Sequence, residues 1–150
     1  SEMCIRDSLL VRQRASMIVC SDKVNQMRHL EFLKNKKDIL HHMSKHADLV
    51  KPKFEIAFQA LDSLGSEIGS YNKPTGGYFI SYNTSKPIAK RVIALCKEAG
   101  VLITPAGSTY PHFEDPTDSN IRLAPTFLDL EDLKDAMEVF TTSLQIAFAE

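Results

Sequence analysis

Several features that would assign this chain of 150 residues to a special class are scarce or missing. It contains no tryptophan, and its three cysteines, Cys4, Cys20 and Cys96, stand far apart and in no CxxC pair. An odd number of scattered cysteines argues against a disulfide framework and a zinc site, and favours a reducing compartment. No apolar run approaches the roughly 18 residues of a membrane span, and no signal peptide is recognisable. We therefore expect a cytoplasmic protein without a membrane partner.

An excess of one charge is also missing, because 18 basic residues stand against 19 acidic ones and the formal net charge is -1. No basic stripe is interleaved with aromatic residues, so nucleic acid is not an expected partner. What is present is an ordinary globular composition, with 43% hydrophobic and 25% charged residues. A chain of this length and composition can bury one core of its own.

The N-terminal part of the chain is predicted to be helical after a short leader. SEMCIRDS resembles adapter-derived sequence, so residues 1–13 are set aside as a non-native leader. Ser21-Asp22 is a good N-cap pair for a helix over residues 23–35. A longer helical stripe follows, and Pro52 predicts a kink or a short break within it. The stripe consists of Leu40, Met43, Ala47, Val50, Phe54, Ala57, Leu61 and Leu64.

In the second half of the chain, the spacing of the apolar residues is no longer that of a helix. Strand-forming residues around the turn signal KPTGG predict two short antiparallel strands that include Tyr71, Phe79 and Tyr82. Pro87 opens a helix that Gly100 ends. VLIT and NIRLA are predicted strands on either side of a turn-rich loop, and a last helix begins at about residue 129. This order predicts the α/β class, as an α+β sandwich in which a small mixed sheet packs against helices.

Common catalytic and binding motifs are absent. His42 and His46 stand four residues apart, as in HExxH, but no glutamate or further ligand accompanies them, so no metal site is expected. Gly76-Gly77 belongs to no phosphate-binding motif and is interpreted as a tight turn. No nucleophile elbow is present.

Arg122 lies between two aliphatic residues in the predicted strand NIRLA. Successive side chains of a strand point to opposite faces, so Ile121 and Leu123 share one face and Arg122 lies on the other. On this segment alone, a surface arginine or a structural ion pair is the favoured interpretation.

Several segments together resemble a known family. In order and spacing, KPTGGYFISYNT, AKRVIALCKEAG, GVLITPAGSTYPHFEDPTDSNIRLAPTF and LEDLKDAMEVF resemble the small C-terminal domain of class I, fold type I pyridoxal-phosphate aminotransferases, in the aspartate-aminotransferase-like subgroup. DKVNQMRHLEFLKN is similar to the segment that leads from the large domain into the small one. The resemblance implies a connecting helix at residues 14–36 and the small domain at residues 37–150.

The resemblance also implies a function. Such an enzyme moves an amino group between an amino acid, of the aspartate or glutamate type, and a 2-oxo acid, with pyridoxal phosphate as cofactor, and works as a homodimer. Arg122 matches the arginine that binds the α-carboxylate of the substrate, and Phe79 matches an aromatic residue that lines the substrate cleft. Tyr110 could reach the mouth of that cleft. A core phenylalanine and a packed loop tyrosine are the structural alternatives.

Lys86 in Thr84-Ser85-Lys86 resembles the motif of the cofactor-binding lysine, but that lysine belongs to the large domain of the family. We therefore expect no catalytic or cofactor-binding residue within this chain, and no activity from the chain alone. Two other interpretations remain open. One is the effector-binding domain of a transcription regulator that resembles an aminotransferase and keeps the same arginine. The other is a free-standing small domain that binds carboxylates without a cofactor.

Overall fold

The computed structural model describes residues 10–15 and 22–150, which form parts of two compact units, Ser1–Lys45 and His46–Glu150. Most of the expected leader, residues 1–13, lies outside the described residues, and so does Ser21 of the expected N-cap pair. Within the remainder of the leader, Leu10 and Val11 are exposed.

The first unit is helical. Helix α2 spans Lys23–Phe32, and the Asp22 carboxylate accepts a hydrogen bond from the Asn25 N–H at 3.1 Å, which confirms the expected N-cap. No residue of α2 is buried. Helix α3, Lys36–Asp62, begins in this unit, and its N-terminus is capped by the Asn35 side chain.

The short break that Pro52 could introduce in α3 is not observed, and the helix runs through this residue. The hydrogen bond that proline removes would be accepted by the carbonyl of Asp48, an exposed residue, so water can take its place. In addition, the apolar stripe is not buried along its whole length: Leu40 and Met43 are exposed, and full burial begins at Phe54.

The sheet belongs to the second unit. The part of the chain that the structure describes contains three strands, β1 (Gly69–Tyr71), β2 (Ile80–Thr84) and β3 (Asn120–Leu123), in the order β1-β2-β3. Both pairs are antiparallel, with Tyr71 opposite Tyr82 and Tyr82 opposite Ile121. The predicted antiparallel pair around the turn is therefore confirmed.

The expected mixed sheet is antiparallel throughout these strands, because the predicted strand VLIT, residues 101–104, forms no ladder. Val101 and Ile103 are half-buried against the core, so their side chains pack although their backbone has no strand partner. A strand needs a neighbouring backbone as well as suitable side chains. The α/β class itself is confirmed.

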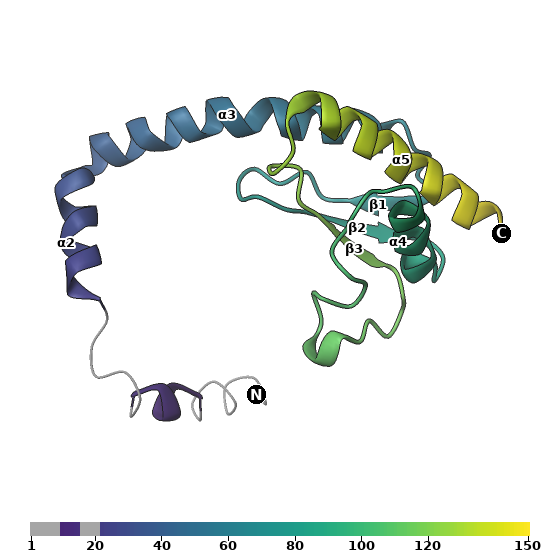
Figure 1. Cartoon of the computed structure of the whole chain (residues 1–150), viewed down its shortest axis with the longest axis horizontal. Helices are drawn as coiled ribbons and strands as arrows, with labels where there is room; N and C mark the ends of the chain where they lie inside the picture. The colour runs from purple at the N-terminus through teal and green to yellow at the C-terminus, as the bar shows by residue number, and fades with distance from the viewer. Residues whose placement is uncertain (1–9, 16–21) are drawn as a thin grey trace. The chain divides into compact units, whose positions relative to one another are not determined.

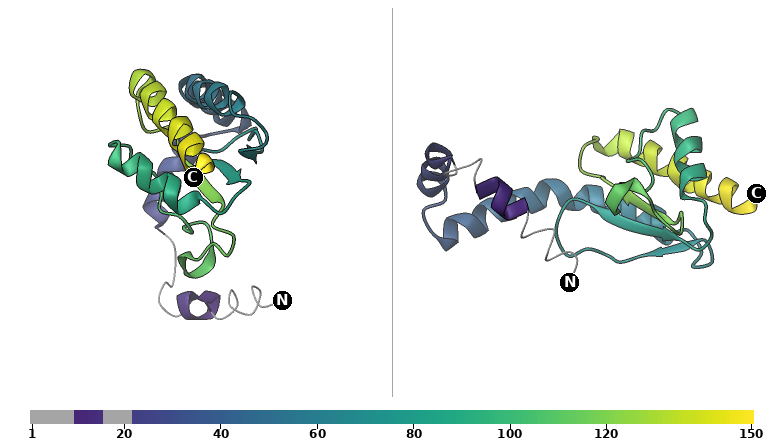
Figure 2. Two further views of the ribbon diagram at one scale, coloured as in Figure 1. Left: turned by 90° about the vertical axis from the view of Figure 1, so that its right-hand side faces the viewer. Right: turned by 90° about the horizontal axis from the view of Figure 1, so that it is seen from below.

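The core lies between one face of the sheet and the helices (Figures 1 and 2). The last part of α3, helix α4 (Ala89–Glu98) and helix α5 (Leu130–Ala149) contribute to a single buried cluster. A row of aromatic rings joins α3 to α5 across the sheet, with centroid separations of 5.9, 6.4 and 6.0 Å between successive members. Its members are Phe58, Tyr71, Tyr82 and Phe140.

The helix ends follow the sequence signals. Gly100 has a positive φ of 89° directly after the C-cap of α4, a conformation that glycine adopts without strain. At the start of α5, the Asp129 carboxylate accepts hydrogen bonds from the N–H groups of Glu131 and Asp132. Both boundaries are as predicted.

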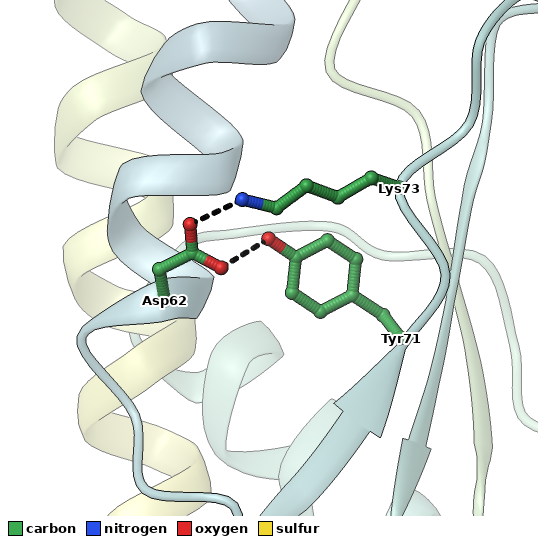
Figure 3. Close-up of polar contacts among 3 residues, drawn as sticks. All are labelled: Asp62, Tyr71 and Lys73. Carbon is green, nitrogen blue, oxygen red and sulfur yellow. Dashed lines mark hydrogen bonds and ion pairs between the residues drawn. The ribbon is translucent and has the colours of Figure 1, made fainter.

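A polar cluster connects the end of α3 to β1 and the segment after it (Figure 3). The Asp62 carboxylate accepts a hydrogen bond from the Tyr71 hydroxyl and forms an ion pair with Lys73, both at 2.6 Å. The hydrogen bond from Lys73 lowers the pKa of Asp62, whereas burial and the neighbouring carboxylate raise the pKa of Tyr71. These contacts anchor Tyr71 and Lys73, where the segment that leads to Phe79 begins, to the end of α3.

Candidate functional site

The second face of the sheet is polar. Ser81 lies directly opposite Arg122, and Asn83 lies opposite Asn120, so these four side chains share a face. The other face carries Ile80, Tyr82, Ile121 and Leu123, all buried. The alternation predicted for NIRLA is therefore confirmed, with Arg122 opposite the core.

Arg122 is half-buried and makes few polar contacts. Its Nη2 donates a long hydrogen bond of 3.4 Å to the Thr104 hydroxyl, and its Cζ lies 4.7 Å from the centroid of the Phe79 ring. The Nε atom is buried without an acceptor among the described residues. Within the same part of the chain, no carboxylate forms an ion pair with the guanidinium. A cavity of about 110 Å³ lies beside Arg122, between residues 101–104, 122–125 and α5.

The two other predicted site residues, Phe79 and Tyr110, differ in their contacts with Arg122. Phe79 precedes β2 and is 51% exposed, so it is not a core residue. Tyr110 is half-buried at the start of a short 3₁₀ turn, Pro111–Phe113, and its N–H donates to the Gly107 carbonyl. Among the described residues it makes no hydrogen bond or ring contact with Arg122. Of the three expected substrate-binding residues, Phe79 thus contacts Arg122, and the role of Tyr110 stays a prediction.

Sequence reasoning missed the buried amide of Asn120. Its Nδ2 donates to the Ser81 hydroxyl and to Asn83 Oδ1, and its Oδ1 accepts from the Thr109 hydroxyl, all at 2.8 Å. The amide therefore ties the loop after residue 104 to both strands of the polar face. Nothing in the local sequence signals these contacts, because their partners lie 11 to 39 residues away.

Asp115 closes the same loop where it joins β3. Its carboxylate accepts hydrogen bonds from the N–H groups of Thr117, Ser119 and Asn120 at 2.8 to 2.9 Å. Burial by itself would raise the pKa of Asp115, but these hydrogen bonds and that of the Thr117 hydroxyl outweigh it and lower the pKa to about 2. The signal available in the sequence was DPT, since aspartate readily caps the turn that follows it.

Gly107 explains how this loop turns. Its φ is +80°, and a Cβ atom at this position would collide with the Phe113 carbonyl. Only glycine fits both requirements without rearrangement. The loop between Thr104 and β3 is therefore shaped by a glycine at one end and by Asp115 at the other.

The histidines and the lysine singled out in the sequence contact aromatic rings or a backbone carbonyl. Within residues 10–15 and 22–150, no group of three or more His, Cys, Asp or Glu residues could hold a metal ion. His42 contacts the Phe32 ring, and His46 contacts the Tyr78 ring. Lys86 donates from Nζ to the Phe148 carbonyl at 2.6 Å and lies 4.1 Å from the Phe148 ring centroid. None of the described helices is long and apolar enough to cross a membrane.

With this geometry in place, the chain can be compared with known proteins. Residues 11–150 match the family model of aspartate aminotransferase. The chain belongs to the aspartate aminotransferase family. The predicted resemblance to pyridoxal-phosphate aminotransferases is therefore confirmed.

Relatives within the family are clearly similar in sequence. An aspartate aminotransferase of Corynebacterium glutamicum is 40% identical over 131 residues, which cover 86% of this chain and 30% of that protein. A Mycolicibacterium smegmatis protein described as an aminotransferase is 44% identical over 131 residues, which cover 86% of this chain and 31% of the relative. The chain thus spans about a third of the length of these relatives.

Solved structures of aminotransferases have a similar fold over this chain. The crystal structure of an aspartate transaminase from Corynebacterium glutamicum has a TM-score of 0.83 and 36% identity, and the match covers 91% of this chain and 33% of that one. LysN of Thermus thermophilus, an α-aminoadipate aminotransferase complexed with N-(5'-phosphopyridoxyl)-L-leucine, has a TM-score of 0.72 at 21% identity. That match covers 93% of this chain and 35% of the neighbour, and at this identity it supports the fold alone.

Proposed function

We propose that this chain is the substrate-binding small domain of a transaminase that moves an amino group between an amino acid and a 2-oxo acid. Aspartate and glutamate are the first candidate substrates, because an aspartate aminotransferase is among the relatives. The observation that carries the proposal is Arg122, which lies on the polar face of the sheet with no ion-pair partner among the described residues. Its charge remains available for a ligand.

Arg122 would bind the α-carboxylate of the substrate. A guanidinium is always charged and offers parallel N–H donors to both oxygens of a carboxylate, so it fixes orientation as well as position. An internal carboxylate would compete for the same donors, and the described residues supply none. Orienting the substrate in this way lowers the entropic part of the activation barrier.

Pyridoxal phosphate is the cofactor that the family implies, and it supplies an electron sink for the reacting carbon. Lys86 does not fit the role of its binding lysine, because its amine already contacts the Phe148 carbonyl and ring. We therefore place the cofactor-binding residues in a part of the protein outside this chain. The chain alone should show no transaminase activity. Incubation with the cofactor, borohydride reduction and mass spectrometry should find no single modified lysine.

The domain boundaries belong to the same proposal. Residues 14–36 would connect a large domain to the small domain at residues 37–150, in a cytoplasmic homodimer. The support is the surface of α2, where apolar side chains are 65 to 67% exposed and could pack against further protein. These side chains are Val24, Met27, Leu30 and Phe32.

The decisive experiment is Arg122→Lys in the longer protein, meaning this chain together with the proposed large domain. We expect kcat/KM to fall on the order of a hundredfold, as for a lost charge pair, because a point charge on a flexible stem cannot form two parallel hydrogen bonds. Arg91→Lys is the matched control. Arg91 forms an ion pair with Glu150 at 2.6 Å, so the same substitution there should leave kcat/KM unchanged.

The result that would contradict the proposal is equally specific. If Arg122→Lys keeps normal kinetics but melts several degrees lower, the arginine is a structural residue. If the longer protein carries out no amino transfer but binds amino acids or 2-oxo acids through Arg122, the effector-binding interpretation replaces the enzyme.

A further inference from the structure

Phe79 and Arg122 are neighbours on the polar face of the sheet. Ser81 lies directly opposite Arg122, and Phe79 precedes Ser81 by two residues, so alternation places Phe79 on the same face. Such diagonal neighbours are within reach when one is aromatic and the other long. The observed separation of 4.7 Å between the ring centroid and the Arg122 Cζ is that of a cation–π contact.

The place of Phe79 is set by the sheet. The next residue, Ile80, is fully buried and lies opposite Leu123, the residue that follows Arg122. The backbone on either side of the contact is therefore anchored in the core. The Phe79 ring itself is 51% exposed, so burial contributes only part of what a core phenylalanine would gain. Its position against the guanidinium calls for another explanation.

The contacts of Arg122 leave one edge of the guanidinium available. The ring of Phe79 lies against its Cζ, and Nε is buried, so a ligand cannot reach Nε in this conformation. Nη2 carries two hydrogens and directs one toward the Thr104 hydroxyl. A carboxylate would therefore bind to the terminal edge, with one oxygen on Nη1 and the other on Nη2.

We infer that Phe79 is a positioning residue, whose ring holds the Arg122 guanidinium in the orientation that presents Nη1 and Nη2 to a carboxylate. The inference rests on the proposed function of Arg122. A long arginine side chain has many rotamers, and a binding group that must first be ordered binds more weakly than a preorganised one. An aromatic face restricts the cation without using any of its N–H donors.

The first test compares Phe79→Leu with Phe79→Tyr in the longer protein. Phe79→Leu removes the ring, and we expect KM for the amino acid to rise and kcat/KM to fall about tenfold, the scale of a partly desolvated cation–π contact. Phe79→Tyr keeps the aromatic face and should stay within about twofold of wild type. The melting temperature of each variant is measured alongside. If Phe79→Leu folds poorly, Phe79→Met provides a second variant without a ring.

Phe148→Leu is the matched control. Phe148 also lies against a cation, Lys86, and among the described residues no ring or cation–π contact joins it to Phe79 or Arg122. Its loss removes the same kind of interaction at a different place. It should leave kcat/KM unchanged.

A double-mutant cycle shows whether Phe79 acts through Arg122. In the Arg122→Lys background, Phe79→Leu should reduce kcat/KM by less than about twofold, because the group that the ring positions is gone. A further tenfold loss in that background would show that Phe79 acts independently of Arg122 and would overturn the inference.

The outcomes separate the inference from the proposed function. If Arg122→Lys loses about a hundredfold in kcat/KM while Phe79→Leu stays near wild type, the proposed function stands and the inference is wrong. If Arg122→Lys itself has no kinetic effect, the proposed function fails and the inference fails with it. The proposed function and the inference are both supported by a combination of three results. Phe79→Leu reduces kcat/KM, Phe79→Tyr does not, and Phe79→Leu has little further effect in the Arg122→Lys background.

Discussion

The two faces of the small sheet differ in what their side chains contact. On one face, Tyr82 and Ile121 are about 1% exposed and pack under the helices. On the other, Ser81 is exposed and Arg122 is half-buried, and their partners are hydroxyls, amides and one aromatic ring. The residues of the two faces are adjacent in sequence, because strand side chains alternate.

This difference separates the residues that stabilise the fold from those that the proposed function assigns to binding. The apolar face stabilises the fold through burial, so its side chains have no freedom to serve a ligand. The polar face contributes less to the core and can keep an unpaired cation. Variants on the two faces should therefore affect different measurements.

The largest expected effect on stability is where helix α5 packs against the apolar face of the sheet. Phe140 is 1% exposed and meets the Tyr82 ring edge-on at 6.0 Å. Phe140→Ala should reduce the free energy of unfolding by about 3–5 kcal/mol, through lost burial and a residual cavity. Urea unfolding of wild type and variant measures the change. A loss below 1 kcal/mol would mean that the core does not depend on the packing of α5 against the sheet.

An intermediate effect is expected where the loop joins the polar face. The pKa of Asp115 is about 2 in the folded state, below its ordinary value of 3.8, so the unfolded state takes up a proton first as the pH falls. Its contribution, about 2 kcal/mol, is present above about pH 4 and is lost as the pH falls toward 2.

Asp115→Asn should remove that contribution at pH 7 and flatten the dependence of stability on pH between about 5 and 2. Urea unfolding at a series of pH values tests this, with Glu114→Gln as the control. Glu114 is exposed and precedes Asp115 in the sequence. Equal slopes for wild type and Asp115→Asn would contradict the assigned role of the hydrogen bonds.

The smallest effect on stability is expected for Arg122. Arg122→Lys keeps most of the apolar stem and lies opposite the core, so the free energy of unfolding should change by less than about 0.5 kcal/mol. The same variant carries the largest expected kinetic loss. Thermal unfolding together with kcat/KM measures both. A large change in stability would remove the distinction between the two faces.

Much of the fold could be predicted because its signals are local. Asp22 and Asp129 cap helices through N–H groups two or three residues away, and Gly100 ends a helix through its own φ. The alternation around Arg122 depends only on the geometry of one strand. Each of these features needs no distant part of the chain, so the pattern of residues was sufficient.

Other features depend on partners far away in the sequence. VLIT has strand-forming residues, yet among the described residues no strand pairs with residues 101–104. The amide of Asn120 finds acceptors 37 and 39 residues away. The stripe that begins at Leu40 is buried only from Phe54 on, where the rest of the core packs against it.

The sequence by itself therefore determined the helices and their caps, the hairpin, the side of the strand on which Arg122 lies, and the family. Only the tertiary structure decided which residues surround that arginine, because it placed Phe79 against the guanidinium. The physical reason is the separation in sequence between the residues that make each contact. Caps and alternation arise from contacts within a few residues, whereas the surroundings of Arg122 require the pairing of β2 with β3, which joins segments about forty residues apart.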